Sequence, residues 1–268
     1  MLKIPIQKAE KFSKISNKFS YDSNPYTLAF SGFYENNEEL LIYQRDPLYM
    51  NDFPFLSLPK NKKHWIRGIF TDASQVDIEM IKNENIEVRN SFVYGPEYYY
   101  NTQDFIDLSV SNKTFRKHVN NFKNNYEFKI KNSYPQKKIL EFLDKWTSSQ
   151  KEQNELFDNS NEFEKFCIKM CKVIKGKWLF IEVDKELVGY CLSYQFNKDF
   201  WVGIHQKVDY NYKGLSRFLL HKRASLFPNT SYFSLGTGAR DEGIKKFKEE
   251  LRPFKKEDRY YIITGNRL

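Results

Sequence analysis

The chain has few of the residues that build disulfide frameworks or metal sites. Its three cysteines are an odd number and include no Cys-X-X-Cys pair, which favours reduced core cysteines in a cytoplasmic protein over a disulfide framework. The four histidines, His64, His118, His205 and His221, show no spacing typical of zinc ligands. We therefore expect no metal site and no tightly bound cofactor.

Long apolar runs are also missing. No run approaches the roughly 20 residues that a helix needs to cross a membrane. Residues 1–20 are basic and mildly amphipathic, and they lack the apolar region and cleavage site of a signal peptide. We expect a soluble chain in the cytoplasm, able at most to touch a membrane surface.

Positive charge is abundant. Lys and Arg outnumber Asp and Glu by 43 to 34, for a net charge of +9. Such a chain suits an anionic partner, either RNA, a phosphate-rich cofactor or an anionic lipid surface, although a solvated basic surface is an open alternative. Residues 113–124 have helical spacing with a cationic outer face. We call the following residues the basic belt: Lys113, Arg116, Lys117, His118, Lys123, Lys129, Lys131, Lys137 and Lys138.

The chain length of 268 residues allows one large domain or two ordinary ones. After an N-terminal extension over 1–20, aromatic and β-branched runs in residues 21–110 predict strands and one apolar period predicts a helix. The strands are expected at 26–30, 39–43, 64–70 and 97–100, with a hairpin at Asn36 and Asn37 and the helix at 74–83.

Residues 111–268 begin with the basic helix and two further amphipathic helices, around 139–146 and 163–174. Three apolar runs joined by short polar turns then predict an antiparallel meander over 178–204. A helix opening at 212–217, a strand at 232–235, a helix at 241–251 and a strand at 259–264 complete the chain. The fold class is therefore α/β (α+β).

Lys248 occupies an unusual position on the helix at 241–251. Residues three, four and seven apart share one helix face, and Lys248 shares its face with Asp241, Ile244, Phe247 and Leu251. A lysine on an apolar face either covers that surface with its stem while its charge stays in water, or is aimed at a site. Both interpretations are open at this point.

Three ordered patterns resemble the acyltransferase domain of phosphatidylglycerol lysyltransferases and its stand-alone relatives, within the general N-acetyltransferase (GNAT) superfamily. Residues 98–108 are similar to a strand followed by a short helix with an acidic first turn. Residues 113–126 are similar to a Lys/Arg-rich helix ending in Asn–X–Phe, here Asn120 to Phe122. Residues 241–248 are similar to the run Asp–X–Gly–Leu–Arg–X–Phe–Lys. Fem-type peptidyltransferases, which use aminoacyl-tRNA, resemble the chain more distantly.

The resemblance implies tandem GNAT-like domains, each a mixed, largely antiparallel sheet flanked by helices. The first, over 21–110, would be a degenerate copy, and the second, over 111–268, would hold the chemistry. It implies transfer of an activated acyl or aminoacyl group from tRNA or coenzyme A to an amine or hydroxyl. The full-length lysyltransferases carry membrane spans that this sequence lacks, so a peptide or other soluble acceptor is as open as a lipid.

The same reaction suggests the site residues. Donor phosphates need backbone N–H groups at a helix N-terminus, which Lys213, Gly214, Leu215, Ser216 and Arg217 could supply. Only one glycine stands in this turn, a departure from the acetyl-CoA pattern that favours another donor.

In the transition state, the carbonyl oxygen gathers negative charge and needs a fixed donor. The resemblance assigns this role to Lys248. Asp241 and His205 are candidate bases for the attacking group, although each has a plain structural alternative, as a helix cap and a surface histidine. Phe247, Trp201 and Arg240 are the candidate substrate contacts.

Two functions of different class therefore remain open. The favoured one is a GNAT-fold acyl- or aminoacyltransferase. The alternative is a noncatalytic module that keeps the fold and uses the basic belt to bind RNA or an anionic membrane surface. The acceptor and the oligomeric state are not predicted.

Overall fold

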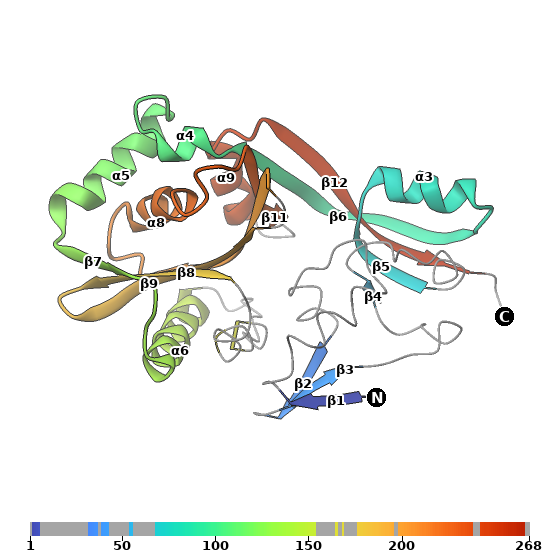
Figure 1. The fold of residues 1–268 in the computed structure, drawn as a ribbon, viewed down its shortest axis with the longest axis horizontal. Helices are drawn as coiled ribbons and strands as arrows, with labels where there is room; N and C mark the ends of the chain where they lie inside the picture. The colour runs from blue at the N-terminus through green and yellow to red at the C-terminus, as the bar shows by residue number, and fades with distance from the viewer. Residues whose placement is uncertain are drawn as a thin grey trace.

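A nine-stranded mixed sheet runs through most of the chain (Figure 1). The computed structural model describes residues 2–5, 32–36, 39–42, 54–55, 68–153, 164–165, 168, 176–195, 198–237 and 242–265. The strand order is β4-β5-β12-β6-β11-β10-β9-β8-β7. The strands are β4 (Pro54–Phe55), β5 (Gly68–Ala73), β6 (Val88–Asn101), β7 (Phe128–Lys131), β8 (Lys177–Val183), β9 (Glu186–Gln195), β10 (Phe200–Val208), β11 (Tyr232–Thr237) and β12 (Lys255–Thr264).

Neighbouring strands of this sheet are antiparallel except at two places. The pairs β4–β5 and β10–β11 are parallel. The meander β8–β9–β10 is antiparallel throughout, as the three apolar runs predict. A separate sheet joins β1 (Leu2–Pro5), β2 (Gly32–Asn36) and β3 (Glu39–Ile42). β2 and β3 pair antiparallel close to the predicted hairpin turn, but β2 comprises residues 32–36 and includes Asn36 itself. The strand expected at 26–30, the predicted first arm of that hairpin, lies outside the described residues.

The strand β6 is much longer than the predicted strand at 97–100. Gly95 and Pro96 are residues that usually end a strand, but here they form an irregularity inside β6, which therefore extends back to Val88. Gly95 has φ +146° and lies where the pairing with β12 shifts register. The last strand, β12, lies between β5 and β6. The sheet is therefore continuous across residue 110, and the division into two domains there stays a prediction.

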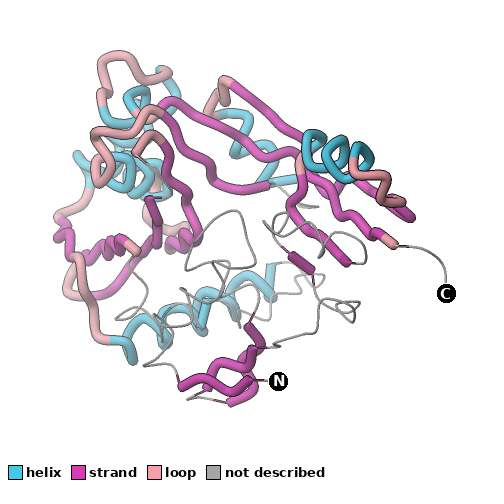
Figure 2. The backbone as a smooth tube through the Cα atoms, turned by 45° about the vertical axis from the view of Figure 1, so that its right-hand side comes forward, coloured by secondary structure: helices cyan, strands magenta, loops and turns pink. Residues whose placement is uncertain are grey.

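Helices cover both faces of the sheet (Figures 1 and 2). α5 (Lys113–Asn125) packs on α8 (Leu215–Ala224), which lies on β8, β9 and β10, while α6 (Gln136–Gln153) lies on the other face of β9 and β10. α3 (Gln75–Asn83) lies on β5, β6 and β12, and its predicted start is confirmed by a capping box between Ser74 and Asp77. α4 (Gln103–Ile106) precedes α5, and α9 (Glu242–Glu250) follows β11.

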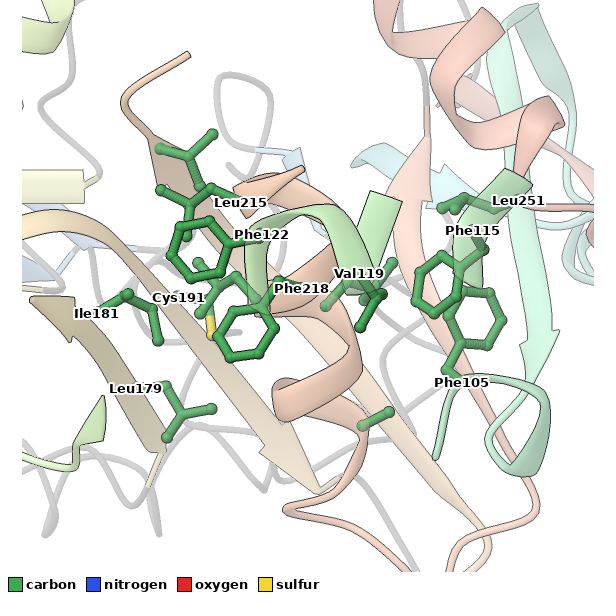
Figure 3. Close-up of a cluster of buried hydrophobic side chains, with 14 of the residues drawn as sticks. Phe105, Phe115, Val119, Phe122, Leu179, Ile181, Cys191, Leu215, Phe218 and Leu251 are labelled. Atoms are coloured by element: carbon green, nitrogen blue, oxygen red, sulfur yellow. The ribbon is translucent and has the colours of Figure 1, made fainter. Parts of the chain in front are cut away.

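The principal core lies between α5, α8 and the sheet (Figure 3). Phe115, Val119 and Phe122 of α5, which repeat at helical spacing, are all buried there. Phe122 and Phe218 of α8 meet with ring centroids 4.7 Å apart. The predicted α+β class, with a largely antiparallel sheet flanked by helices, is confirmed. Among the described residues, no helix combines the length and apolar character needed to cross a bilayer.

Candidate functional site

Two parallel strands separate near the middle of the large sheet. β10 and β11 pair only over three positions, ending at Val202 opposite Ser234. Both strands then become irregular: β10 shifts register against β9 between Gly203 and His205, and β11 shifts against β6 between Ser234 and Thr237. We call this point the β10–β11 fork. Bulges on both sides turn backbone groups away from the ladder, so the fork presents carbonyl oxygens that the sheet does not use.

The ammonium of Lys248 occupies this position. Its Nζ donates hydrogen bonds to the carbonyl oxygens of Leu235 (2.8 Å) and Gly236 (2.9 Å) on β11. Lys248 is only 5% exposed, so its position on the apolar face of α9 reflects burial and not a stem lying along the surface. Gly236 makes the bulge possible because its φ of +72° favours glycine. A Cβ at Gly236 would meet no atom of the described chain within 4 Å, so open space adjoins the fork.

Neighbouring tyrosines hold this lysine in place. The Tyr100 hydroxyl donates to the carbonyl oxygen of Lys248 (2.9 Å), which is one of the last four carbonyl groups of α9. The ring of Tyr98 lies 5.8 Å from Nζ. Burial lowers the pKa of Lys248 to about 8, while the charge of Glu97 raises it and that of Arg223 lowers it. A fixed ammonium that gives up its proton near neutral pH can serve as a hydrogen-bond donor to developing negative charge or exchange a proton.

The turn before α8 is shaped by a close approach of α5. Gly214 caps α8 with φ +90°, and a Cβ there would lie 2.2 Å from the backbone oxygen of His118. Glycine is therefore required by both conformation and space. Of the predicted donor-binding residues, Lys213 is exposed and Leu215 is fully buried in the core. Ser216 accepts hydrogen bonds from the side chain of Gln206 at its carbonyl (3.0 Å) and hydroxyl (3.1 Å).

Arg217 links this turn to α9. Its guanidinium pairs with Glu250 (2.5 Å) and lies 5.1 Å from the ring centroid of Phe247. Phe247 immediately precedes Lys248. The structure therefore brings together the start of α8 and the lysine-bearing helix, which the sequence places some thirty residues apart. Because Glu250 already neutralises Arg217, an incoming phosphate would have to share that charge.

Comparison with known proteins shows where this fold occurs. No family model matches the chain, and no curated protein sequence matches it. Several solved structures, by contrast, have a similar fold. A Bacteroides thetaiotaomicron protein of unknown function matches at 13% identity and a TM-score of 0.65, over 97% of this chain and 98% of its own. FemX matches at 7% identity and 0.60, over 96% and 97%.

A third match is the C-terminal domain of an Agrobacterium fabrum protein assigned as a lysylphosphatidylglycerol synthetase. It is 12% identical with a TM-score of 0.59, over 96% of this chain and 92% of that one. The chain shares the fold of these proteins. The resemblance drawn from the three sequence patterns is thereby confirmed at the level of the fold, while identities this low leave the reaction to be argued from the site.

His205 lies away from Lys248. It pairs with Leu192 on β9, one position past the bulge, and its Nδ1 is 3.8 Å from Glu164. Its neighbours Glu164, Lys207 and Trp146 lie on the α6 side of the sheet: Lys207 Nζ is 3.1 Å from Glu164 and 4.0 Å from the Trp146 ring centroid. Burial lowers the pKa of His205 to about 4. The imidazole is neutral at neutral pH and is separated from Lys248 by the sheet.

The predicted substrate contacts have different surroundings. Trp201 is fully buried, with its ring stacked on Phe227 and Phe233 at centroid distances of 4.9 and 4.2 Å. It packs as a core side chain. Phe247 is half-buried beside Arg217. Arg240 and Asp241, the remaining candidates, lie outside the described residues, as does most of the predicted helix at 163–174.

Two buried charged residues near the fork were not singled out from the sequence. Arg223 of α8 is 2% exposed and Glu97 of β6 is 9% exposed, and both act on Lys248 electrostatically. Arg223 stands four residues after Leu219 and eight after Leu215, on the apolar face of its helix. The spacing rule that singled out Lys248 would have found it.

The basic belt lies on the outer surface of α5 and beyond. Lys123 of α5 and Lys222 of α8 lie close enough that burial and the charge of Lys123 together lower the pKa of Lys222. Similarly, burial and then the charges of Arg217 and Lys117 lower the pKa of His118. The belt thus continues from α5 onto α8, toward the turn at Gly214.

Proposed function

We propose that this protein is a GNAT-fold acyl- or aminoacyltransferase, with the β10–β11 fork as its reaction centre. The observation that carries the proposal is the buried ammonium of Lys248, held by two carbonyl groups of β11 next to open space at Gly236. Burying a lysine is costly. A site that needs a positive hydrogen-bond donor gives a reason to retain it.

In the proposed reaction, an amine or hydroxyl attacks the activated carbonyl of a thioester or a tRNA ester. The carbonyl oxygen becomes negatively charged in the tetrahedral state, and Lys248 donates to it. Such a donor acts strongly in a water-poor site because it is already oriented and needs no reorganisation. Losing one donor of this kind costs roughly 10²–10³-fold in kcat.

The donor would enter along the N-terminal turn of α8. The exposed Lys213 and the backbone N–H groups of Ser216 and Arg217 suit phosphate oxygens, whereas the N–H of Leu215 already donates to the Tyr212 carbonyl oxygen. The basic belt on α5 continues the positive surface. Both acyl-CoA and aminoacyl-tRNA carry the required phosphates. The extent of the belt beyond one turn favours the larger polyanion, aminoacyl-tRNA.

The attacking group must also lose a proton. Asp241 and His205 remain the proposed bases. A neutral imidazole is the form that accepts a proton, but the position of His205 across the sheet supports Asp241 as the first residue to replace.

Turnover and donor binding should be measured in parallel for the intact chain and for Lys248→Ala. Thermal shift with acetyl-CoA, longer acyl-CoAs and charged tRNA selects the donor, and transfer of its labelled acyl group to a panel of amines measures turnover. We expect Lys248→Ala to lose roughly 10²–10³-fold in kcat with little change in donor affinity. Lys246→Ala, which removes an exposed charge from the same helix, is the matched control and should keep both.

The noncatalytic alternative predicts a different pattern. The closely placed Lys123 and Lys222 favour it, because surface lysines gathered together suit a polyanion whether or not chemistry follows. Binding of RNA or anionic vesicles without transfer by either form would support that alternative. Equal transfer by the parent chain and Lys248→Ala would contradict the role of the lysine.

A further inference from the structure

A second buried cation lies beside Gly203, the residue of β10 at which the fork begins. The Arg223 guanidinium reaches from α8 into the sheet, where its Nε donates to the Ser193 hydroxyl and its Nη2 donates to the Leu192 carbonyl oxygen, both on β9. Its Cζ lies 5.7 Å from the ring centroid of Trp201. Because the guanidinium is planar and rigid, two hydrogen bonds fix its position far more tightly than a lysine ammonium could be fixed there.

The absence of a side chain at Gly203 of β10 leaves room for the guanidinium. A Cβ at Gly203 would lie 2.6 Å from Cζ and Nη2 of Arg223 and 2.7 Å from Cδ2 of Leu235. Gly203 is the first residue past the last β10–β11 pair. Arg223 and the Leu235 side chain therefore converge on one point of the fork, over a glycine that leaves them room.

Leu235 connects this point to Lys248. Its side chain lies beside the guanidinium, and its carbonyl oxygen accepts from the lysine ammonium (2.8 Å). A chain of contacts thus runs from the buried arginine through one residue of β11 to the buried lysine.

We propose that Arg223 is a positioning residue for Lys248: its guanidinium fills the opening of the β10–β11 fork and thereby sets where the carbonyl groups of Leu235 and Gly236 point. This proposal rests on the proposed function for its catalytic consequence, but not for its physical content. Two charged groups act on the lysine, Glu97 from β6 and Arg223 from α8, and the Tyr98 ring faces it. Because the Arg223 charge lowers the pKa of Lys248, the arginine also makes the lysine easier to deprotonate.

The test follows the titration of Lys248 directly. The full chain is labelled with 13C at the lysine ε carbons, the Lys248 signal is assigned by its loss in Lys248→Met, and its chemical shift is followed with pH. We expect Arg223→Met to raise the pKa of Lys248. Lys222→Met removes one positive charge from the adjacent position of α8, and this charge is not among those that act on Lys248, so it should leave the titration unchanged.

A second variant keeps the arginine but moves it. Gly203→Ala displaces the guanidinium from the fork and should also raise the pKa of Lys248, so the test survives if Arg223→Met does not fold. Where transfer is measurable, Arg223→Met should lower kcat about tenfold, a loss smaller than that of the donor itself, with donor KM unchanged.

These outcomes separate the two proposals. The NMR titration needs neither donor nor turnover, so a chain that transfers nothing would still show the shift. The positioning role is overturned if Lys248 titrates at the same pH in the parent chain and in both variants. It is equally overturned if Lys222→Met shifts the titration as much as Arg223→Met.

Discussion

Replacing Lys248 by methionine should change how the stability of the protein depends on pH. In the folded chain, burial lowers the pKa of Lys248 from its ordinary 10.5 to about 8. In the unfolded chain, the side chain is in water and keeps its ordinary value. The two states therefore bind different numbers of protons across this interval, and methionine, which has a similar length and no charge, removes the difference.

The sign and size follow from this difference in pKa. Between about pH 8 and 10.5 the unfolded state holds a proton that the folded state has lost, so the free energy of unfolding rises with pH over that range. About 2.5 pH units at about 1.4 kcal/mol each give roughly 3 kcal/mol. Below pH 8 the folded chain bears the full free-energy cost of keeping the Lys248 ammonium charged while it is buried. The parent chain should therefore gain roughly 3 kcal/mol relative to Lys248→Met as the pH is raised.

Urea unfolding followed by tryptophan fluorescence at a series of pH values measures this gain. Other titrating groups contribute equally to both proteins, so they cancel when the two curves are subtracted. The loss of the hydrogen bonds to Leu235 and Gly236 shifts the free energy of unfolding of Lys248→Met by an amount that does not change with pH. Lys246→Met, an exposed position on the same helix, supplies the baseline. Parallel curves for the parent chain and Lys248→Met from pH 7 to 10.5 would refute the assignment of a desolvated ammonium.

Two further predictions concern the scaffold. Gly214→Ala should lower the free energy of unfolding by at least about 2 kcal/mol, because a non-glycine residue in the left-handed conformation costs roughly 1–2 kcal/mol and the new Cβ would clash with the His118 backbone. The loss would be measured as a lower urea midpoint. An unchanged midpoint would show that α5 is not packed against this turn. His205→Gln should make the protein less sensitive to acid. The free energy of unfolding of the parent chain should fall by roughly 3 kcal/mol as the pH falls from 6.5 to about 4, since only the histidine of the unfolded state gains a proton over that range. Acid unfolding curves of equal steepness for the two proteins would contradict the burial of this imidazole.

The sequence predicts most of the architecture around the site. Apolar runs joined by polar turns predict the meander, and helical spacing predicts the buried face of α5, because a helix buries one side and the side-chain period reports it. On α9 the same spacing is right only in part: Leu251 is buried and Phe247 is half-buried, but Ile244 is 45% exposed. The same spacing places Lys248 on that face and leaves its burial open. It cannot indicate the two carbonyl groups that bind the ammonium, since they are turned toward it by a bulge in β11 that depends on pairing with β6.

The position of His205 shows how such a bulge limits inference from sequence. Counting alternate residues along β10 from Trp201 through Gly203 puts His205 on the α8 side of the sheet. The register shift between Gly203 and His205 moves it to the opposite side, because one extra residue exchanges the two faces of a strand.

Arg223 binds at the same irregularity, because it donates to Ser193 and Leu192, the β9 residues that lie opposite Gly203 and His205. The feature that removes the histidine from the face of the lysine therefore also admits the arginine. A base for the proposed reaction is accordingly better sought among residues that reach the α8 face, with Asp241 first among those that the sequence offers.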